Sequence, residues 1–509
     1  MYKLLLCLRY LRTRYIALAS IVSVMLGVAT MIVVNSVMSG FTTEMRNRIH
    51  GILADVVVDA RSLEGMNDAQ WHMEQIRRVA GDQIEGMTPT VAVPAMLSFQ
   101  YGGQWITRQV QLIGIDPQTQ GRVSDFGKYL QHPENRGAMS FQLRRCGYDT
   151  RDHQAGPETP ERVQMRDAGW PHRRRVARAK AFHEQLIESY EPSSAAEPAG
   201  NDSNAALDPF AARRAEPAEF DPATEQHTGV VLGIALAGFR TPEGEDRFLT
   251  LPGDDVKLTF PTAGTPPSAI SDNFTVVDFY ESKMSEYDSS FVFVPIRKLQ
   301  ELRGMIDPGT GIGTVSSIQI KLKPGADAVA VRDRLRAAFP PQLYVVQTWR
   351  DKQGPLLAAV QMETAILNVL LFLIIAVAGF GILAIFLMIV VEKTRDIGIL
   401  KSLGASPGGV MGIFLAYGLS LGLVGSGVGM LIGLLFVRYI NEIADLLGWI
   451  MGHEVFSPDI YYFYEIPTMV NPITIAWIVC GALAIAVLAS VLPALRAALL
   501  HPVEALRYE

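Results

Sequence analysis

Four long stretches without a charged side chain limit what this sequence can fold into. They cover residues 16–38, 366–391, 410–436 and 473–492. A helix needs about 20 apolar residues to cross the hydrocarbon core of a bilayer, so each stretch is long enough to span a membrane. Helices of a soluble core seldom stay uncharged over such lengths. The sequence therefore predicts a membrane protein with four transmembrane α-helices.

The first stretch has a rival interpretation as a cleavable secretory signal. Signal peptides have an apolar region of about 7–15 residues, which a cleavage site of small residues follows. Residues 16–38 are longer than this, and no A-x-A site follows at their end. We therefore expect an uncleaved membrane anchor.

Positive charges flank the four stretches unevenly, which predicts their orientation. Lys and Arg lie in residues 1–15, 392–409 and 493–509, whereas the loop 437–472 is mainly acidic. Lys and Arg of short loops remain on the cytoplasmic side of a membrane. Both termini and the loop 392–409 are therefore predicted to be cytoplasmic, and residues 39–365 and 437–472 to lie outside.

The large region 39–365 is predicted to contain an α+β domain built from two stretches, roughly 50–125 and 228–350, because strand and helix patterns mix there. The predicted strands are 54–59, 109–115, 256–260, 274–279, 291–295, 315–322 and 343–348, and the predicted helix is 326–338. Two polar segments, 39–49 and 353–363, continue the neighbouring spans. They are either interfacial caps or stalk helices that transmit motion.

Residues 130–227 differ in composition and are predicted to be a partly disordered insertion. Residues 142–180 hold ten Arg and Lys against five acidic residues, whereas residues 181–227 hold ten acidic residues against Arg213 and Arg214. The basic run could bind anionic lipid headgroups or nucleic acid, but such runs are more often solvated faces. The formal net charge of −6 argues against nucleic acid as a partner.

The short loop between the second and third spans, EKTRDIGILKSLGAS over residues 392–406, predicts a short amphipathic helix. Ile397, Leu400 and Leu403 recur near one helical face, and Gly404 can end the helix. Such a helix can dock against a soluble cytoplasmic partner, or it can lie on the membrane surface. The spacing alone does not separate these two interpretations.

The third span carries glycines at intervals of four residues. Gly425, Gly429 and Gly433 share one helical face, which allows another helix to approach closely. That face serves either contact between subunits or packing within one subunit.

Enzymatic motifs have little support, so no catalytic residue and no metal site is predicted. Residues 404–408 fit G-x-S-x-G, but they follow a predicted helix, whereas a nucleophile elbow follows a strand. The sequence has no H-E-x-x-H zinc motif and no G-x-x-x-x-G-K-[ST] phosphate-binding loop.

Several motifs together resemble the FtsX-like, MacB-type permeases of ABC transporters, and among these the lipoprotein-releasing LolC/LolE family. The loop 392–405 resembles the recurring E-K-x-x-[DE]-I-G-I-L-[RK]-x-[LM]-G-A. Further similarities lie in RYLR at 9–12, SVMSGF at 36–41, FSPDIYY at 456–462, IPT at 466–468, PALRAA at 493–498 and PVEALRYE at 502–509. The sequence departs at Gly381, where the family usually has asparagine, and in its long insertion.

The resemblance implies a permease subunit in a bacterial inner membrane, which pairs with a second copy or a paralogue. A separate cytoplasmic ATPase would bind ATP and Mg²⁺, so this chain would carry no cofactor. Its movement would extract or release a lipoprotein or lipid-like substrate by mechanotransmission. The implied ATPase-coupling residues are Glu392, Arg395, Asp396, Ile397, Ile399, Lys401 and Leu403. The alternatives are a MacB-like efflux or export permease and an FtsX-like activator of a cell-wall hydrolase that transports nothing.

Overall fold

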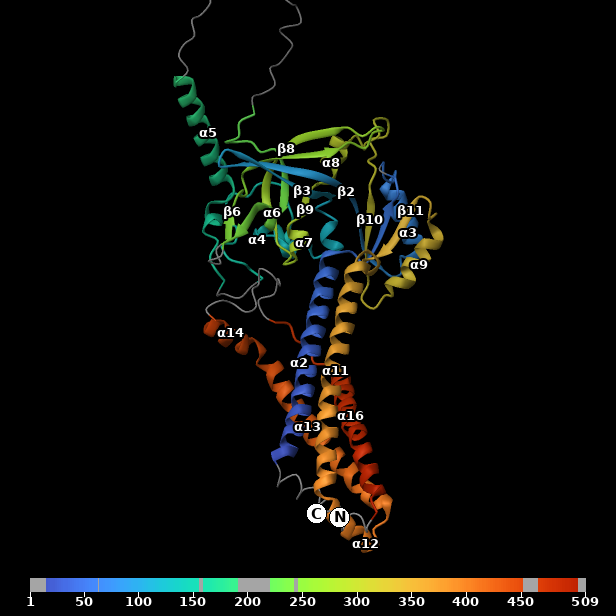
Figure 1. Cartoon of the computed structure of the whole chain (residues 1–509). Coiled ribbons are helices and arrows are strands. Elements are labelled where there is room, and N and C mark those ends of the chain that lie inside the picture. The colour runs from blue at the N-terminus through green and yellow to red at the C-terminus, as the bar shows by residue number, and fades with distance from the viewer. Residues whose placement is uncertain are drawn as a thin grey trace, which may run out of the picture. The chain divides into compact units, whose positions relative to one another are not determined.

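The computed structural model describes residues 15–62, 64–154, 159–190, 220–241, 246–451 and 466–501 (Figure 1). The chain divides into two compact units, Arg48–Lys352 and Met1–Asn47 with Gln353–Glu509. The motifs at 9–12, 456–462 and 502–509 lie outside the described residues. Residues 191–219 of the predicted insertion lie outside them as well.

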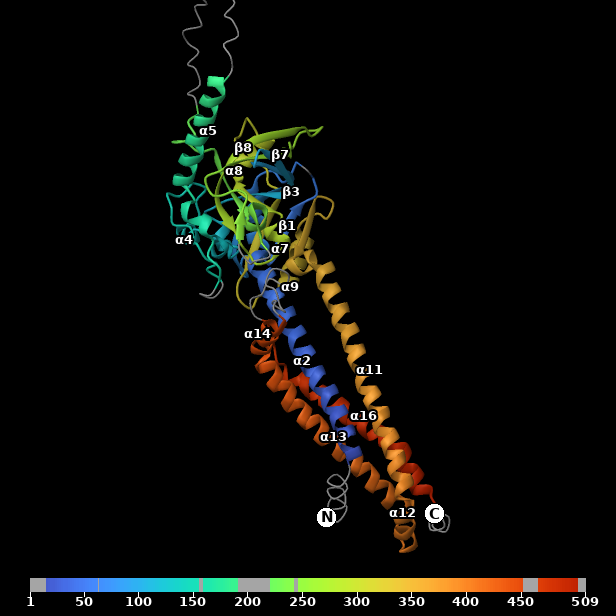
Figure 2. The same cartoon turned by 60° about the vertical axis from the view of Figure 1, so that its left-hand side comes forward.

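Four long helices make up most of the second of these units: α2 (Tyr15–Ile52), α11 (Gly354–Glu392), α13 (Pro407–Arg438) and α16 (Pro472–Leu499). Each contains one of the uncharged stretches. Within the described residues, these four helices are long and apolar enough to cross a membrane, which confirms the four predicted spans. α16 packs along both α11 and α13 (Figures 1 and 2). α2 continues past the end of its uncharged stretch without a break.

Two shorter helices connect or follow the long ones. α12 (Thr394–Ser402) lies between α11 and α13. α14 (Ile440–Met451) follows α13 inside the region predicted only as a loop, and none of its residues is buried.

The first unit contains a four-stranded antiparallel sheet in the order β11-β1-β10-β2. Its strands are β1 (Val56–Ala60), β2 (Ile84–Tyr101), β10 (Ser317–Leu322) and β11 (Tyr344–Thr348). Helices α3 (Ala69–Ala80) and α9 (Ala328–Ala338) pack against each other beside this sheet. The chain thus follows a β-α-β path twice, which is the ferredoxin-like arrangement.

A ring of six strands is inserted between the two β-α-β halves. From β2, the ring continues through β3 (Gln104–Ile115), β9 (Phe291–Pro295), β4 (Thr228–Gly233), β8 (Ala269–Tyr280) and β7 (Asp255–Pro261). β7 pairs back with β2, where Thr259 lies opposite Met96, and this closes the ring. β2 therefore belongs to both sheets, and one apolar core continues between them. The mixed architecture confirms the predicted α+β domain.

Short elements complete this unit. They are η1 (Gln120–Arg122), η2 (Phe126–Tyr129), α6 (Ile234–Ala237), the hairpin β5 (Gly238–Arg240) and β6 (Asp246–Phe248), α7 (Ser285–Asp288), α8 (Ile296–Arg303) and α10 (Trp349–Lys352).

The described part of the predicted insertion is built into the domain. It forms α4 (Pro133–Gly137), η3 (Val163–Asp167) and α5 (Trp170–Tyr190). Phe141, Leu143 and Tyr148 are buried, and the Tyr148 hydroxyl donates to the carbonyl of Val277 on β8 at 2.6 Å. The segment before α5 therefore packs against the ring, while the far half of α5 extends away from it (Figures 1 and 2).

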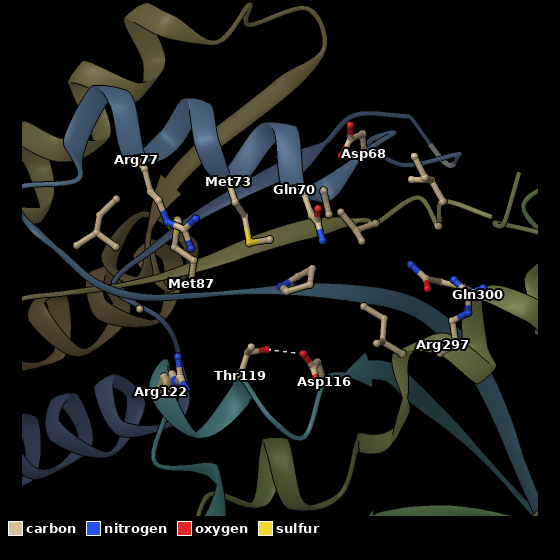
Figure 3. Close-up of a pocket in the computed structure, with 18 of the residues that line it drawn as sticks. Asp68, Gln70, Met73, Arg77, Met87, Asp116, Thr119, Arg122, Arg297 and Gln300 are labelled. Carbon is tan, nitrogen blue, oxygen red and sulfur yellow. Dashed lines mark hydrogen bonds between the residues drawn. The ribbon is translucent and has the colours of Figure 1, made fainter. Parts of the chain in front are cut away.

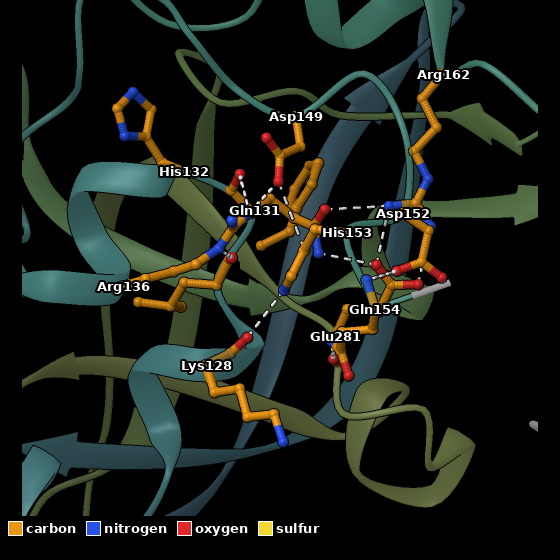
Figure 4. A network of polar contacts seen from close by, with 12 residues as sticks. Lys128, Gln131, His132, Arg136, Asp149, Asp152, His153, Gln154, Arg162 and Glu281 are labelled. Atoms are coloured by element: carbon orange, nitrogen blue, oxygen red, sulfur yellow. Dashed lines mark hydrogen bonds and ion pairs between the residues drawn. The ribbon is translucent and has the colours of Figure 1, made fainter. Parts of the chain in front are cut away.

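The basic run of the insertion is not simply a solvated face, because two of its arginines are buried in ion pairs. Arg162 contacts Glu281 at 2.8 Å (Figure 4). It also contacts Asp246 at 2.8 Å. Arg173 contacts Asp255 at 2.7 Å. Burial alone would raise the pKa of Glu281, but the charges of Arg162 and Lys283 outweigh it and lower this pKa to about 2. These arginines attach the insertion to carboxylates elsewhere in the domain.

Candidate functional site

The turn after α12 is determined by the local sequence. Gly404 adopts a φ of +94°, which favours glycine and ends the helix. Ser406 then caps α13, because its hydroxyl accepts a hydrogen bond from the Gly409 amide at 3.1 Å, and Pro407 occupies the first turn. α12 is thereby joined to α13 through a short turn of defined geometry.

One face of this connecting segment is exposed. It comprises Glu392, Arg395, Asp396, Ile399 and Leu403, whose spacing of three or four residues places them together. Leu403 is 80% exposed and Ile399 is 43% exposed. Asp396 accepts a hydrogen bond from the Lys393 ammonium at 2.6 Å. Exposed apolar side chains bordered by charges suit contact with another protein surface.

The two remaining residues of the predicted coupling set, Ile397 and Lys401, face the helical unit instead. Ile397 is only 3% exposed and belongs to the apolar core that includes Val410 and Ala494. The Lys401 ammonium donates to the carbonyls of Ala498 and Leu500 at 2.6 and 2.7 Å. These carbonyls lie at the end of α16, where backbone acceptors lack helical partners. Lys401 thus attaches α12 to α16.

The three predicted packing glycines of α13 all lie against α2 of the same chain. A Cβ atom on Gly429 would be 2.6 Å from the Met25 carbonyl, and one on Gly425 would be 2.9 Å from Val24. A Cβ atom on Gly433 would be 3.2 Å from Ala29. Of the two interpretations left open by the sequence, the structure shows packing within one chain for this face.

A cavity of about 390 Å³ lies between α2, α11 and the start of α16. Polar side chains are unusually frequent in its lining: Asn35, Ser36, Ser39, Thr42, Thr43, Arg46, Gln361, Thr364, Asn471 and Thr474. The cavity begins near the end of the uncharged part of α2, so apolar helix and polar groups meet there. Intramembrane or near-membrane polar groups of this kind often mark ligand paths.

Sequence reasoning did not identify this cavity. A signal was present in α2, because Asn35, Ser39, Thr42 and Arg46 recur along one helical face. The other wall could not be anticipated, because it depends on the segment before α16 crossing α2. There the Met469 amide donates to the Ser36 carbonyl at 2.9 Å, and a Cβ on Gly40 would be 2.3 Å from the Pro467 carbonyl oxygen.

Comparison with known proteins shows that part of this helical unit is similar to a known family. Residues 368–502, which include α12, match the FtsX-like permease C-terminal family. The chain carries an FtsX-like permease domain. This domain contains the exposed face of α12, the Lys401 contacts and the glycines of α13, and thus most of the helical unit described above.

Individual relatives extend the similarity beyond this domain. The chain is 30% identical to the lipoprotein-releasing system transmembrane protein LolC of Xylella fastidiosa over 46% of this chain and 55% of that protein. It is 28% identical to LolC of Neisseria meningitidis over 58% of this chain and 66% of that protein. It is 22% identical to LolE of Haemophilus influenzae over 96% of this chain and 94% of that protein. The matches thus span between about half and two thirds of the LolC relatives.

Proposed function

We propose that this chain is the permease subunit of an ABC transporter of the LolC/LolE type, which uses ATP hydrolysis by a separate ATPase to release lipoproteins from a bacterial inner membrane. The observation that carries the proposal is the exposed face of α12. It presents Leu403, Ile399 and neighbouring charges on a helix that is fixed to two long helices.

The orientation in this proposal follows from the charges near the helices. Lys393, Arg395 and Lys401 surround α12, whereas Glu442 and Asp445 lie on α14 at the other end of α13. The positive-inside rule then puts α12 and both chain termini in the cytoplasm, where an ATPase would be. The α+β unit and the cavity near Arg46 would lie at the outer side of the membrane.

The polar cavity fits a ligand with a polar head and an apolar tail. Its hydroxyl and amide groups, together with Arg46, can hydrogen-bond to a headgroup, while α2 and α11 continue as apolar surface. An acylated protein has this chemistry at its lipid-bearing end. We propose that the substrate enters from the outer leaflet and that movement of α2 and α11 expels it, without passage through the helices.

The ATPase partner can be tested by isolating the protein from its membrane in mild detergent. We expect a nucleotide-binding subunit to co-purify and ATP turnover to depend on α12. The double variant Glu392→Lys with Arg395→Glu should retain membrane insertion but lose most of the bound ATPase. Arg438→Glu with Glu442→Lys is the matched control, because it exchanges the same charges at the opposite end of α13. Recovery of no ATPase with the unmodified chain would exclude the mechanism.

The substrate is tested separately by depleting the chain in cells and labelling lipoproteins with radioactive palmitate. The proposal expects labelled lipoproteins to accumulate in the inner membrane. Normal distribution, with the ATPase still bound to the chain, would reject lipoproteins as substrate and leave the permease assignment standing. A cell-wall hydrolase bound to residues 50–350 would instead favour the activator function.

A further inference from the structure

A cleft of about 850 Å³ opens in the α+β unit, where the ferredoxin-like half meets the ring (Figure 3). One wall is α3, and the other comes from the start of β2, the segment after β3 and α8. The volume lies in the upper part of the roughly 300–1,000 Å³ that ligand sites occupy. The cleft lies in a different unit from α12 and from the cavity between the long helices, so its function can be examined independently of the proposed transport.

Two arginines lie on opposite walls at one end of the cleft. Arg77 extends from α3, and Arg122 belongs to η1 on the facing wall (Figure 3). Both are exposed, and within the described part of the chain neither is paired with a carboxylate. A guanidinium presents five donors in a planar fork that suits a carboxylate. The pair can therefore hold an anionic group between them.

Apolar side chains line the cleft next to these arginines. Met73 projects from α3 towards the cleft, with Met87 on β2 below it (Figure 3). Pro89 and Ile312 also line the cleft and extend the apolar surface. Methionine side chains are flexible and polarisable, so they adapt to ligands of different shape. This surface suits apolar side chains of variable sequence.

Three carboxylates in the lining, those of Asp68, Glu85 and Asp116, disfavour a ligand with several negative charges. Asp116 accepts a hydrogen bond from the Thr119 hydroxyl at 3.0 Å, and Asp68 accepts one from the Trp71 amide at 3.0 Å, so both carboxylates are held in the cleft wall. They would repel a phosphate-rich headgroup. The exposed amide group of Gln70 can instead bond to a peptide backbone.

We propose that this cleft binds an extended peptide segment that carries an acidic side chain. The carboxylate lies between Arg77 and Arg122, and apolar side chains of the peptide lie against Met73 and Met87. At the other end, Arg297 is already bonded to the Gly311 carbonyl at 3.1 Å and Gln300 to the Thr314 carbonyl at 2.8 Å. These bonds keep that wall in place.

The test uses the full chain purified in detergent and two fluorescein-labelled pools of eight-residue peptides. Aspartate is fixed at the centre of one pool and asparagine at the centre of the other, and the remaining positions vary among alanine, leucine, serine and glycine. Fluorescence anisotropy should show at least about tenfold tighter binding of the aspartate pool, because a charge-assisted contact contributes about that factor. Salt should reduce this preference.

Single variants identify the site. Arg77→Gln and Arg122→Gln should each weaken binding of the aspartate pool about tenfold and leave the asparagine pool unchanged. Arg78→Gln is the matched control, because Arg78 is an exposed arginine on the same helix outside the cleft. Unchanged thermal unfolding of each variant shows that the fold is retained. Equal binding of both pools, no binding of the aspartate pool, an equal effect of Arg78→Gln, or binding of anionic phospholipid vesicles in place of peptide overturns the proposal.

Discussion

Replacing Arg162 by methionine should destabilise the α+β unit strongly, because it leaves the buried carboxylate of Glu281 without its main partner. The two side chains are each 6% exposed, and the guanidinium bonds to both carboxylate oxygens at 2.8 Å. Removing one partner of a buried ion pair costs about 3–5 kcal/mol. Lys283 also contacts Glu281, so part of the compensation remains, and we expect a loss at the lower end, about 3 kcal/mol.

Hydrogen exchange of the full chain in detergent, followed by mass spectrometry, measures this loss locally. A free-energy loss of about 3 kcal/mol corresponds to a roughly hundredfold drop in protection of β8 and residues 159–180, since about 1.4 kcal/mol is tenfold in an equilibrium constant. Arg166→Met is the control, because Arg166 is 59% exposed on the same segment and pairs with an exposed glutamate. Combining Arg162→Met with Glu281→Gln should restore part of the protection. Equal exchange in the Arg162 and Arg166 variants would refute the reasoning.

Three further predictions concern other parts of the chain. Gly429→Leu should destabilise the helical unit by about 1–3 kcal/mol, because its side chain would overlap the Met25 backbone. Gly427→Leu is the control, because a Cβ atom at Gly427 meets nothing within 4 Å; a detergent melting assay that gives equal shifts for both variants would contradict this. Burial raises the pKa of Asp278 to about 6 and of Asp288 to about 7, so the folded state binds protons more tightly than the unfolded state. The stabilising contribution of these two carboxyl groups is complete below pH 3.8 and disappears as the pH rises through 6 to 7. The α+β unit should therefore melt at a lower temperature at pH 8 than at pH 5. An equal melting temperature at both pH values would contradict this prediction. Leu403→Ser should weaken binding of the proposed ATPase about ten- to hundredfold, whereas Leu446→Ser on α14 should not; surface plasmon resonance with the purified ATPase measures both.

The parts of the fold that could be predicted are those that a pattern within one short stretch of sequence indicates. The uncharged stretches identify the four long helices because a single charge would interrupt them, and the strand β9 was predicted at its observed limits, Phe291–Pro295. β2, α3 and the closure of the ring were not predicted, because the pairing of Met96 with Thr259 joins segments far apart in the sequence. The insertion was judged by its composition, which shows the charge of Arg162 but not that it would meet Glu281, 119 residues away.

The short helix between the second and third spans was predicted, but the sequence did not indicate which of its residues are buried and which are exposed. The spacing of Ile397, Leu400 and Leu403 indicated one shared face, yet Ile397 is buried and Leu403 is among the most exposed large apolar residues in the described part of the chain. Periodicity marks the apolar residues of a short helix, but it does not say which of them pack against the same molecule. That depends on where α16 ends, which the residues of α12 do not encode.

This division has a mechanical consequence within the helical unit. α12 is joined covalently to α11 and α13, and Lys401 adds a third attachment to the end of α16 through two short hydrogen bonds. Buried Ile397 fills the space between these attachments. A displacement imposed on the exposed face of α12 therefore reaches three long helices at once, because moving α12 alone would break two charge-assisted bonds and open a cavity at Ile397. α2 lies against α13, because both backbone and side-chain atoms of α2 closely approach Gly425, Gly429 and Gly433. The exposed face of α12 is thus connected to all four long helices through these contacts.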